Sequence, residues 1–197
     1  AISLYGVRDL VLQYLRSDRA AQRQDILKKI QSREGGTPGH VARIIAHTAP
    51  PLETDFDSPD SKIPGLIDLA APGMTGYSDM RWWVQLPPEY DPARRYPAIV
   101  TLHSANTTPE HQIDWWAGSY NEQTASRHGQ AARHGYIVIA PAWTKQFQSK
   151  YEYSAREHAA VLFSLRDACK RFSIDTDRVF LSGHSIGGDA AWDIGLA

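Results

Sequence analysis

The residues with the clearest chemical potential lie near the end of the chain, where Gly183 and Gly187 flank Ser185. Residues 179–181 before them are apolar, and residues 189–193 after them suit a helix. The pattern predicts a strand, a sharp turn and a helix, with the serine on a strained backbone at the turn. The glycines stand where two backbones pass too closely for a Cβ. Such a serine is suited to attack a carbonyl carbon.

A serine that attacks a carbonyl also needs hydrogen-bond donors for the oxyanion that forms. The helix expected after Ser185 would direct its free N–H groups and its positive dipole end at that oxyanion. The Gly-x-Ser-x-Gly pattern alone is common, and its position between a predicted strand and a predicted helix makes it specific. The alternative is a Gly-rich strand-to-helix turn with an ordinary surface serine.

Composition excludes several classes of partner. The chain has 197 residues with a net charge of −1, so no strong field would recruit nucleic acid or an anionic membrane. Its single cysteine, Cys169, rules out an internal disulfide and a metal site built from cysteines. No apolar run approaches the roughly 20 residues that a membrane span needs. We therefore expect no nucleic-acid partner and no membrane span.

The two ends of the sequence differ from ordinary termini, which are usually polar and unstructured. The chain starts at Ala1 with residues that already suit a helix, and it stops at Ala197, within the helix expected after Ser185. We interpret the chain as a piece of a longer protein. A missing N-terminus would also remove any signal peptide.

Three regions are expected along the chain. Residues 1–51 predict three short amphipathic helices, the second started by Ser17 and Asp18 and the third by Thr37 followed by proline. Residues 52–64 are acidic and rich in turn formers, which indicates a linker. Residues 65–197 alternate strands and helices, which predicts an α/β fold.

Within the third region, strands are expected at 66–70, 80–86, 98–103, 136–140 and before Ser185. Helices are expected at 122–134, after a capping box at 154–157, and after Ser185. Residues 104–120 are interpreted as a long loop, and 175–177 as a turn. This order favours a mainly parallel sheet, and such sheets bind ligands beyond the carboxyl ends of their strands.

Three stretches, residues 84–92, 96–103 and 175–188, are similar in order and spacing to part of a known family. They resemble the N-terminal half of an α/β-hydrolase domain of the carboxylesterase, depolymerase-like and prolyl-oligopeptidase-like kind. The resemblance covers residues 80–197 and none of residues 1–50. It implies a truncated α/β-hydrolase fold, a mostly parallel sheet with flanking helices, preceded by a small helical region.

The resemblance also assigns roles to residues. Ser185 would be the nucleophile, and the backbone N–H of Ile186 would be the first oxyanion donor. The second donor would be the backbone N–H of Ser104 or Ala105, in the loop after the third strand. The family usually has His-Gly at this point, whereas this chain has His103 followed by serine.

The resemblance places the general base outside the sequence. In this family an acidic residue and then a histidine follow the serine. Only Asp189 and Asp193 follow Ser185 here, with no histidine, so the acid and the histidine are expected downstream. None of the eight histidines is expected to be the base, and His103 is expected to hold the oxyanion loop. The others are His40, His47, His111, His128, His134, His158 and His184.

Three tryptophans flank the expected site. Trp115 and Trp116 lie in the 104–120 segment, and Trp143 follows the next strand. These side chains would either form the walls of a substrate pocket or pack the loop on the sheet. Both readings stay open.

Two hypotheses of different classes follow. The first is a serine hydrolase that acts on a small-molecule ester and needs no metal and no organic cofactor. A peptide, cleaved in the manner of prolyl oligopeptidase, is the second choice of substrate. Residues 1–197 alone would be inactive and poorly soluble, because the strand before Ser185 would be an unprotected edge. The second is a non-catalytic interaction module on the same scaffold.

Overall fold

The computed structural model describes residues 2–17, 19–52, 62–71 and 79–197, and it divides the chain into two compact units. Residues 1–53 with residues 170–172 form the first unit, and residues 54–169 and 173–197 form the second. The expected linker at 52–64 falls mostly on residues outside the described part, so it stays a prediction.

The first unit is built from three helices, α1 (Ile2–Arg16), α2 (Ala20–Gln31) and α3 (Pro38–Ala46). Val7, Val11, Ile26 and Ile30 form its buried core. The start of α3 is confirmed, because the Thr37 side chain accepts a hydrogen bond from the amide of His40 (3.3 Å). The expected start of α2 is wrong: its N-cap is Arg19, which makes no side-chain cap bond.

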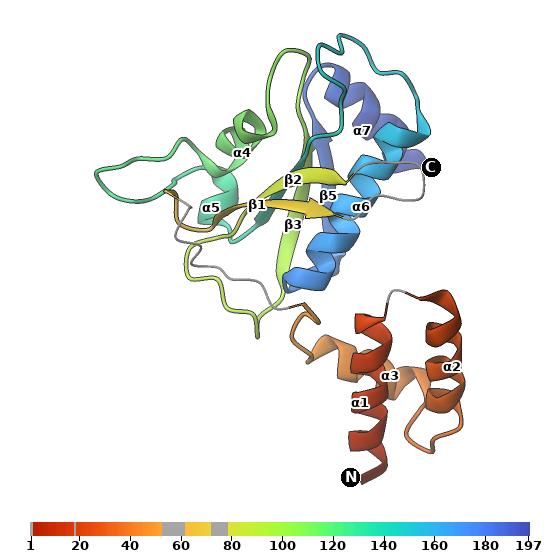
Figure 1. Cartoon of the computed structure of the whole chain (residues 1–197). Helices are drawn as coiled ribbons and strands as arrows, with labels where there is room; N and C mark the ends of the chain where they lie inside the picture. Colours follow the sequence, from red (N-terminus) through yellow and green to blue (C-terminus); the bar gives the residue numbers. More distant parts are fainter. Residues whose placement is uncertain (1, 18, 53–61, 72–78) are drawn as a thin grey trace. The chain divides into compact units, whose positions relative to one another are not determined.

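The second unit is organised around a five-stranded sheet (Figure 1). The strands are β1 (Leu66–Ala71), β2 (Met80–Gln85), β3 (Tyr96–Leu102), β4 (Ile137–Pro141) and β5 (Ile174–Gly183), in the order β1-β2-β4-β3-β5. β3 pairs in parallel with β4 and β5, whereas β2 is antiparallel to both β1 and β4. The sheet is therefore mixed, and its parallel part holds the strand that leads to Ser185.

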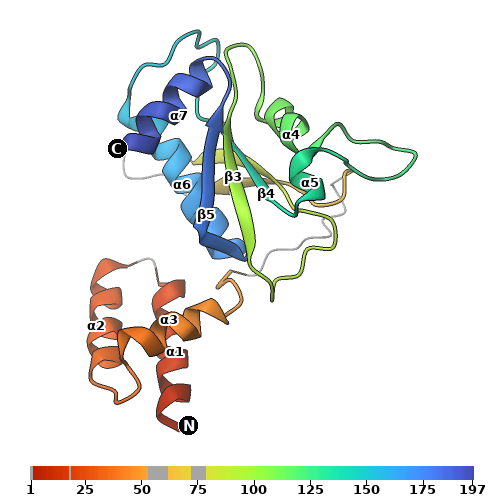
Figure 2. The same ribbon diagram turned by 180° about the vertical axis from the view of Figure 1, so that it is seen from behind.

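Helices cover both faces of this sheet. On one face lie α4 (Pro109–Ala117) and α5 (Gln130–Arg133), and on the other lie α6 (Ala155–Arg171) and α7 (Ile186–Leu196) (Figures 1 and 2). Ile113 of α4 and Ala131 of α5 pack with Ile99 and Val138 of the sheet. β4 is buried along its whole length, as expected for a strand covered on both faces.

Helix α4 corrects the expectation of a long loop at 104–120. Its start has the same chemistry as that of α3, since Thr108 is the N-cap and Pro109 is the first helical residue. His111 completes a capping box, because its Nδ1 accepts a hydrogen bond from the Thr108 amide (3.3 Å). Thr108 followed by Pro109 is thus a local sequence signal for the start of α4.

The helix expected at 122–134 is mostly wrong, since only Gln130–Arg133 is helical. The Asn121 side chain accepts hydrogen bonds from the amides of Gln123 (2.9 Å) and Thr124 (3.3 Å). Asn121 and Ser126 also form an isolated antiparallel bridge. A side chain that satisfies backbone amides in this way offers the chain a turn in place of a helix.

The turn expected at 175–177 lies inside β5. The pairing of β5 with β3 is irregular there, because Tyr96 pairs with Ile174 but Ala98 pairs with Val179. Asp175 accepts a hydrogen bond from the Asp177 amide (3.1 Å), which stabilises the extra residues as a bulge. The strand continues past the bulge to the serine.

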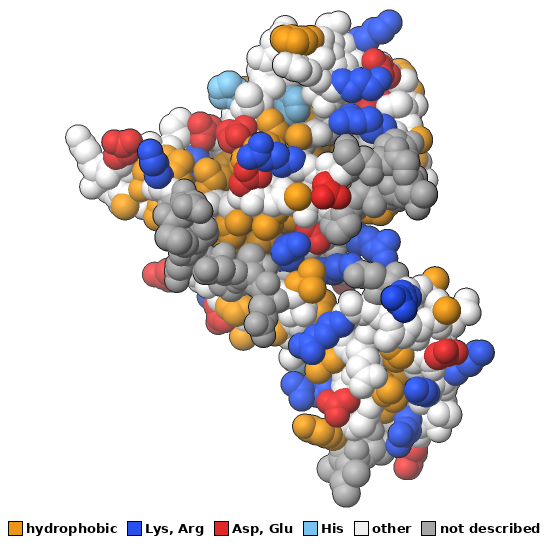
Figure 3. Space-filling view, viewed as in Figure 1, with side chains coloured by type: hydrophobic (Ala, Val, Ile, Leu, Met, Phe, Trp, Pro, Cys, Tyr) orange, Lys and Arg blue, Asp and Glu red, His pale blue; other side chains and the backbone are white. Residues whose placement is uncertain are grey.

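The surface carries no patch of a single charge on the face drawn in Figure 3, where acidic and basic side chains are interspersed. One such pair is Asp68 and Arg81 on neighbouring strands β1 and β2. Among the described residues, no helix is both long and apolar enough to cross a membrane.

Candidate active site

Ser185 lies at the tip between β5 and α7, with its residue surface exposed. Its backbone has φ 54° and ψ −121°, a conformation that residues other than glycine rarely adopt. The strain is held by the surrounding backbone, because Ser185 O accepts hydrogen bonds from the amides of Gly188 (2.7 Å) and Asp189 (3.2 Å). The geometry presents a hydroxyl on a rigid turn at the carboxyl edge of the parallel strands.

The two flanking glycines are required by close backbone contacts. A Cβ on Gly183 would lie 1.9 Å from the carbonyl oxygen of Gly187. A Cβ on Gly187 would lie 2.3 Å from the carbonyl oxygen of Leu102, the last residue of β3. Real Cβ atoms do not approach backbone oxygens this closely, so the turn can form only with glycine at both positions.

The candidate oxyanion donors lie on two segments that touch. Ile186 is the first residue of α7, so its amide N–H has no acceptor within the helix. The loop with Ser104 and Ala105 follows β3, and His184 N donates to the carbonyl of Leu102 (3.1 Å). Ser104 is buried and Ala105 is half-buried. The structure therefore brings both predicted donor segments to the turn, while their role as donors stays a prediction.

His103 fixes the start of the loop after β3. The ring is buried, and its Nδ1 donates to the carbonyl oxygen of Ser104 (3.0 Å). Burial lowers the pKa of His103, because a charged imidazolium is costly away from water. On the other side, the indole of Trp143 donates to the carbonyl of His103 (3.2 Å). The loop is thus held from two directions.

The three predicted pocket tryptophans occupy different environments. Trp143 is fully buried beneath the loop that contains Ser104. Trp116 is half-buried and packs on the sheet. Trp115 is 67% exposed, and its ring stacks on that of His184 with 5.5 Å between the ring centroids. Trp115 is therefore the one of the three that lies beside Ser185 at the surface, and a substrate role for any of them stays a prediction.

A histidine–aspartate pair exists in the described residues, away from the serine. His158 Nε2 lies 2.9 Å from Oδ2 of Asp193 and 2.7 Å from the Tyr151 hydroxyl, which itself donates to Asp193 (2.6 Å). The hydrogen bond from Tyr151 holds the pKa of Asp193 below its usual value. Asp193 is eight residues after Ser185 on α7, or about 12 Å along the helix axis. This pair is too distant to activate the hydroxyl.

The turn around Ser185 accordingly brings together the residues predicted as nucleophile and as oxyanion donors, and these roles stay predictions. No hydrogen bond joins the Ser185 hydroxyl to a histidine within the described part of the chain. In the same part, no three His, Cys, Asp or Glu side chains are grouped so that they could bind a metal ion.

Two solved structures with a similar arrangement are named as esterases. A bacterial heroin esterase superposes over 70% of this chain, with a TM-score of 0.50 and 20% identity. An esterase from Pyrobaculum calidifontis superposes over 96% of this chain, with a TM-score of 0.50 and 16% identity. The chain has the α/β-hydrolase fold. It spans 41% and 50% of the lengths of these two chains.

The sequence comparisons add one relative. Dipeptidyl-peptidase 5 of Porphyromonas gingivalis is 28% identical over 125 residues, which is 58% of this chain and 17% of that protein. No family model matches the sequence. Enzymes with the α/β-hydrolase fold carry their nucleophile at a turn between a strand and a helix, and Ser185 as such a nucleophile stays a prediction.

Two features of this region had little sequence signal. The stack of Trp115 on His184 depends on α4, which was not expected. The cluster of Tyr151, His158 and Asp193 joins positions up to 42 residues apart, and no local pattern links them. Neither feature could be found without the order of the strands.

Proposed function

We propose that this chain supplies the nucleophile and the oxyanion donors of a serine hydrolase that cleaves carboxylic esters. The observation on which the proposal rests is the strained, exposed backbone of Ser185 between β5 and α7. Glycines at minus two and plus two allow that backbone, and the free amide of Ile186 starts the helix beside it. An ordinary surface serine would need none of these arrangements.

In the proposed reaction the Ser185 hydroxyl oxygen attacks the ester carbonyl carbon and gives up its proton to a base. The backbone N–H groups of Ile186 and of Ser104 or Ala105 stabilise the oxyanion. The intermediate collapses, the alcohol leaves with the proton from the base, and an acyl-enzyme remains. Water then hydrolyses the acyl-enzyme by the same steps. A histidine oriented by Asp or Glu, from residues outside 1–197, serves as the base.

The substrate class has two candidates. Carboxylic esters are favoured, and the two solved structures named as esterases support this choice. A peptide substrate is the second candidate, supported by the relative named as a dipeptidyl peptidase. The proposed mechanism uses no metal and no organic cofactor for either substrate.

A fluorophosphonate probe on the natural full-length protein tests the nucleophile, because such probes react covalently with activated serines. We expect labelling that Ser185→Ala abolishes and that Ser119→Ala, at another exposed serine, leaves unchanged. Labelling that persists in Ser185→Ala would assign the nucleophile elsewhere. No labelling of the wild-type protein would favour the non-catalytic interaction module.

Substrate class is tested on the same protein with two chromogenic compounds, a p-nitrophenyl ester and a dipeptidyl p-nitroanilide. We expect a larger kcat/KM for the ester, and hydrolysis of both compounds should disappear in Ser185→Ala. A larger kcat/KM for the anilide would make the protein a peptidase. Residues 1–197 alone are expected to hydrolyse neither compound.

A further inference from the structure

The helical unit has apolar surface that its own core does not cover. The buried core comes from α1 and α2, and Val41 and Ile44 of α3 pack against it without being buried. Ile45 of the same helix is exposed. A helix normally buries its apolar face against a neighbour, so α3 leaves part of that face open beside the core.

This surface faces a cavity of about 590 Å³, within the range of small-molecule sites. All three helices and the loop between α2 and α3 line it. Its apolar walls include two residues from each helix, namely Val11, Leu15, Leu27, Ile30, Val41 and Ile45. Leu27 is 44% exposed and Ile45 is 39% exposed, so the cavity is open to a ligand.

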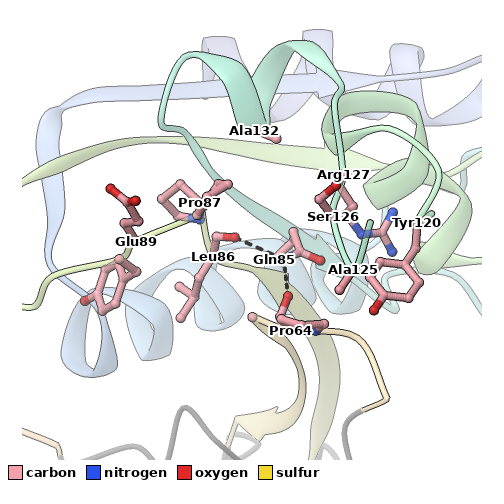
Figure 4. Close-up of a pocket in the computed structure, with 13 residues that line it drawn as sticks. Pro64, Gln85, Leu86, Pro87, Glu89, Tyr120, Ala125, Ser126, Arg127 and Ala132 are labelled. Carbon is pink, nitrogen blue, oxygen red and sulfur yellow. Dashed lines mark hydrogen bonds between the residues drawn. The ribbon is translucent and has the colours of Figure 1, made fainter. Parts of the chain in front are cut away.

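The cavity differs from the one drawn in Figure 4, which lies in the second unit. There, two polar atoms that have no partner among the described residues, Oε1 of Gln85 and Nε of Arg127, are sealed from solvent. In the helical unit the polar lining residues Gln31, Arg33 and Thr37 are exposed. A ligand in that cavity can therefore reach polar groups as well as apolar walls.

Arg33 gives the cavity a positive end. Its backbone is fixed in the turn after α2, because its amide donates to the carbonyl of Ile30 (3.1 Å) and its carbonyl accepts from the amide of Gly36 (2.9 Å). Its guanidinium has no ion-pair partner among the described residues, and the neighbouring Glu34 does not line the cavity. The amino end of α3 begins in the same loop, and its dipole also favours an anion.

We propose that this cavity binds a medium-chain carboxylate such as octanoate. The alkyl chain lies between the apolar residues of α1, α2 and α3, and the carboxylate lies beside the exposed guanidinium of Arg33. An amine of the same length would bring a second positive charge to this end of the cavity, and an alcohol would lack the charge attraction. The proposal is independent of the reaction proposed for Ser185.

Isothermal titration calorimetry on the natural full-length protein compares octanoate with octan-1-ol, octylammonium and butanoate. We expect octanoate to bind about threefold more tightly than octan-1-ol, because an ion pair with an exposed arginine is weak. Octylammonium should bind more weakly than octan-1-ol. Butanoate should bind about tenfold more weakly than octanoate, since it buries fewer methylene groups.

Arg33→Gln is the decisive variant for the carboxylate, because it removes the charge at an exposed position and leaves the apolar walls intact. We expect octanoate and octan-1-ol to bind this variant equally, with octan-1-ol at its wild-type affinity. Arg8→Gln is the matched control, since Arg8 is an exposed arginine of α1 outside the lining of the cavity. It should keep the preference for octanoate.

Val41→Trp assigns the binding to this cavity, because the larger side chain fills it. We expect the variant to lose saturable binding of octanoate. Circular dichroism checks that it is folded. If it is unfolded, Ile45→Glu replaces it at an exposed position of the lining. The added negative charge should then make octanoate bind more weakly than octan-1-ol.

Three results would overturn the proposal. The absence of saturable octanoate binding at millimolar concentrations would mean that another part of the full-length protein fills the cavity. A preference for octanoate over octan-1-ol that persists in Arg33→Gln, or equal binding of octanoate and octylammonium, would show that Arg33 does not hold the carboxylate. Octanoate binding that is unchanged in the folded cavity variant would place the ligand elsewhere on the protein.

Discussion

His103 shows how one buried side chain stabilises the loop beside the candidate site. Its Nδ1–H donates to the carbonyl of Ser104, which fixes the imidazole as the neutral tautomer with the proton on Nδ1. A second proton would place a charge in a buried position. Burial therefore lowers the pKa of His103, and the hydrogen bond to Ser104 offsets part of that effect. The lowered pKa couples the stability of the folded chain to pH.

We predict that the free energy of unfolding falls as the pH is lowered below about 6.5, the ordinary pKa of histidine. Below that pH the unfolded chain takes up the proton, while folded His103 does not. The contribution of His103 to the free energy of unfolding is therefore complete above that pH and is lost as the pH falls through the folded pKa. Because a single proton is involved, the free energy of unfolding changes by at most about 1.4 kcal/mol per pH unit. Urea denaturation at several pH values measures it.

The matched variants are His103→Asn, which keeps a donor near the position of Nδ1, and His134→Asn at an exposed histidine. The first should remove part of the pH dependence and the second should not. If the pH dependence of His103→Asn equals that of the wild type, another group is responsible.

At the scale of elements, the junction of β5 and α7 depends on backbones in contact. Gly187 packs against the end of β3, and Gly188 next to it faces a less crowded region. A Cβ on Gly188 would lie 3.5 Å from the carbonyl oxygen of Gly183, an ordinary contact distance. Two adjacent glycines in one helix turn therefore have different reasons to be present.

We predict opposite results for alanine at the two positions. Gly187→Ala should lower the free energy of unfolding by about 3 kcal/mol or more, because its Cβ collides with the carbonyl of Leu102. Gly188→Ala should be neutral or stabilising by up to about 1 kcal/mol, as expected for glycine replaced inside a helix. Chemical denaturation followed by tryptophan fluorescence compares them. Similar losses in both variants would contradict the packing seen at Gly187.

At the scale of the whole molecule, β5 is an edge strand of the described sheet. It pairs with β3 on one side, and no described strand pairs with it on the other. Phe180 of this strand is 50% exposed. Unpaired backbone groups beside an apolar side chain favour pairing between copies of a chain.

We predict that residues 1–197, expressed alone, self-associate at micromolar concentrations and that Phe180→Lys reduces the association. A lysine on an edge strand opposes strand pairing through charge. The control is Leu162→Lys, which places the same charge at an exposed apolar residue of α6. Light scattering across a dilution series measures the effect. A monomeric wild-type fragment, or equal effects of both variants, would contradict the role of the edge.

The sequence was informative where a structural requirement is local. The glycines around Ser185 and the apolar run of β4 each depend on neighbours in the chain, and both appear in the structure as the sequence indicated. The position of β4 between β2 and β3 depends on pairing between distant segments, and so does the cluster of Tyr151, His158 and Asp193. Helix α4 is the exception, since it differs from the expected loop although Thr108 and Pro109 are a local signal for a helix start.

The strained backbone of Ser185 has a consequence for how such a chain evolves. A φ of 54° with ψ of −121° costs a residue with a Cβ about 1–3 kcal/mol, whereas glycine adopts it with little penalty. The residue that best suits this backbone is thus not the one that the proposed chemistry needs. Selection for stability alone would therefore favour replacement of Ser185 by glycine, which removes this cost. A lineage that no longer needed the reaction would lose its nucleophile while keeping the fold.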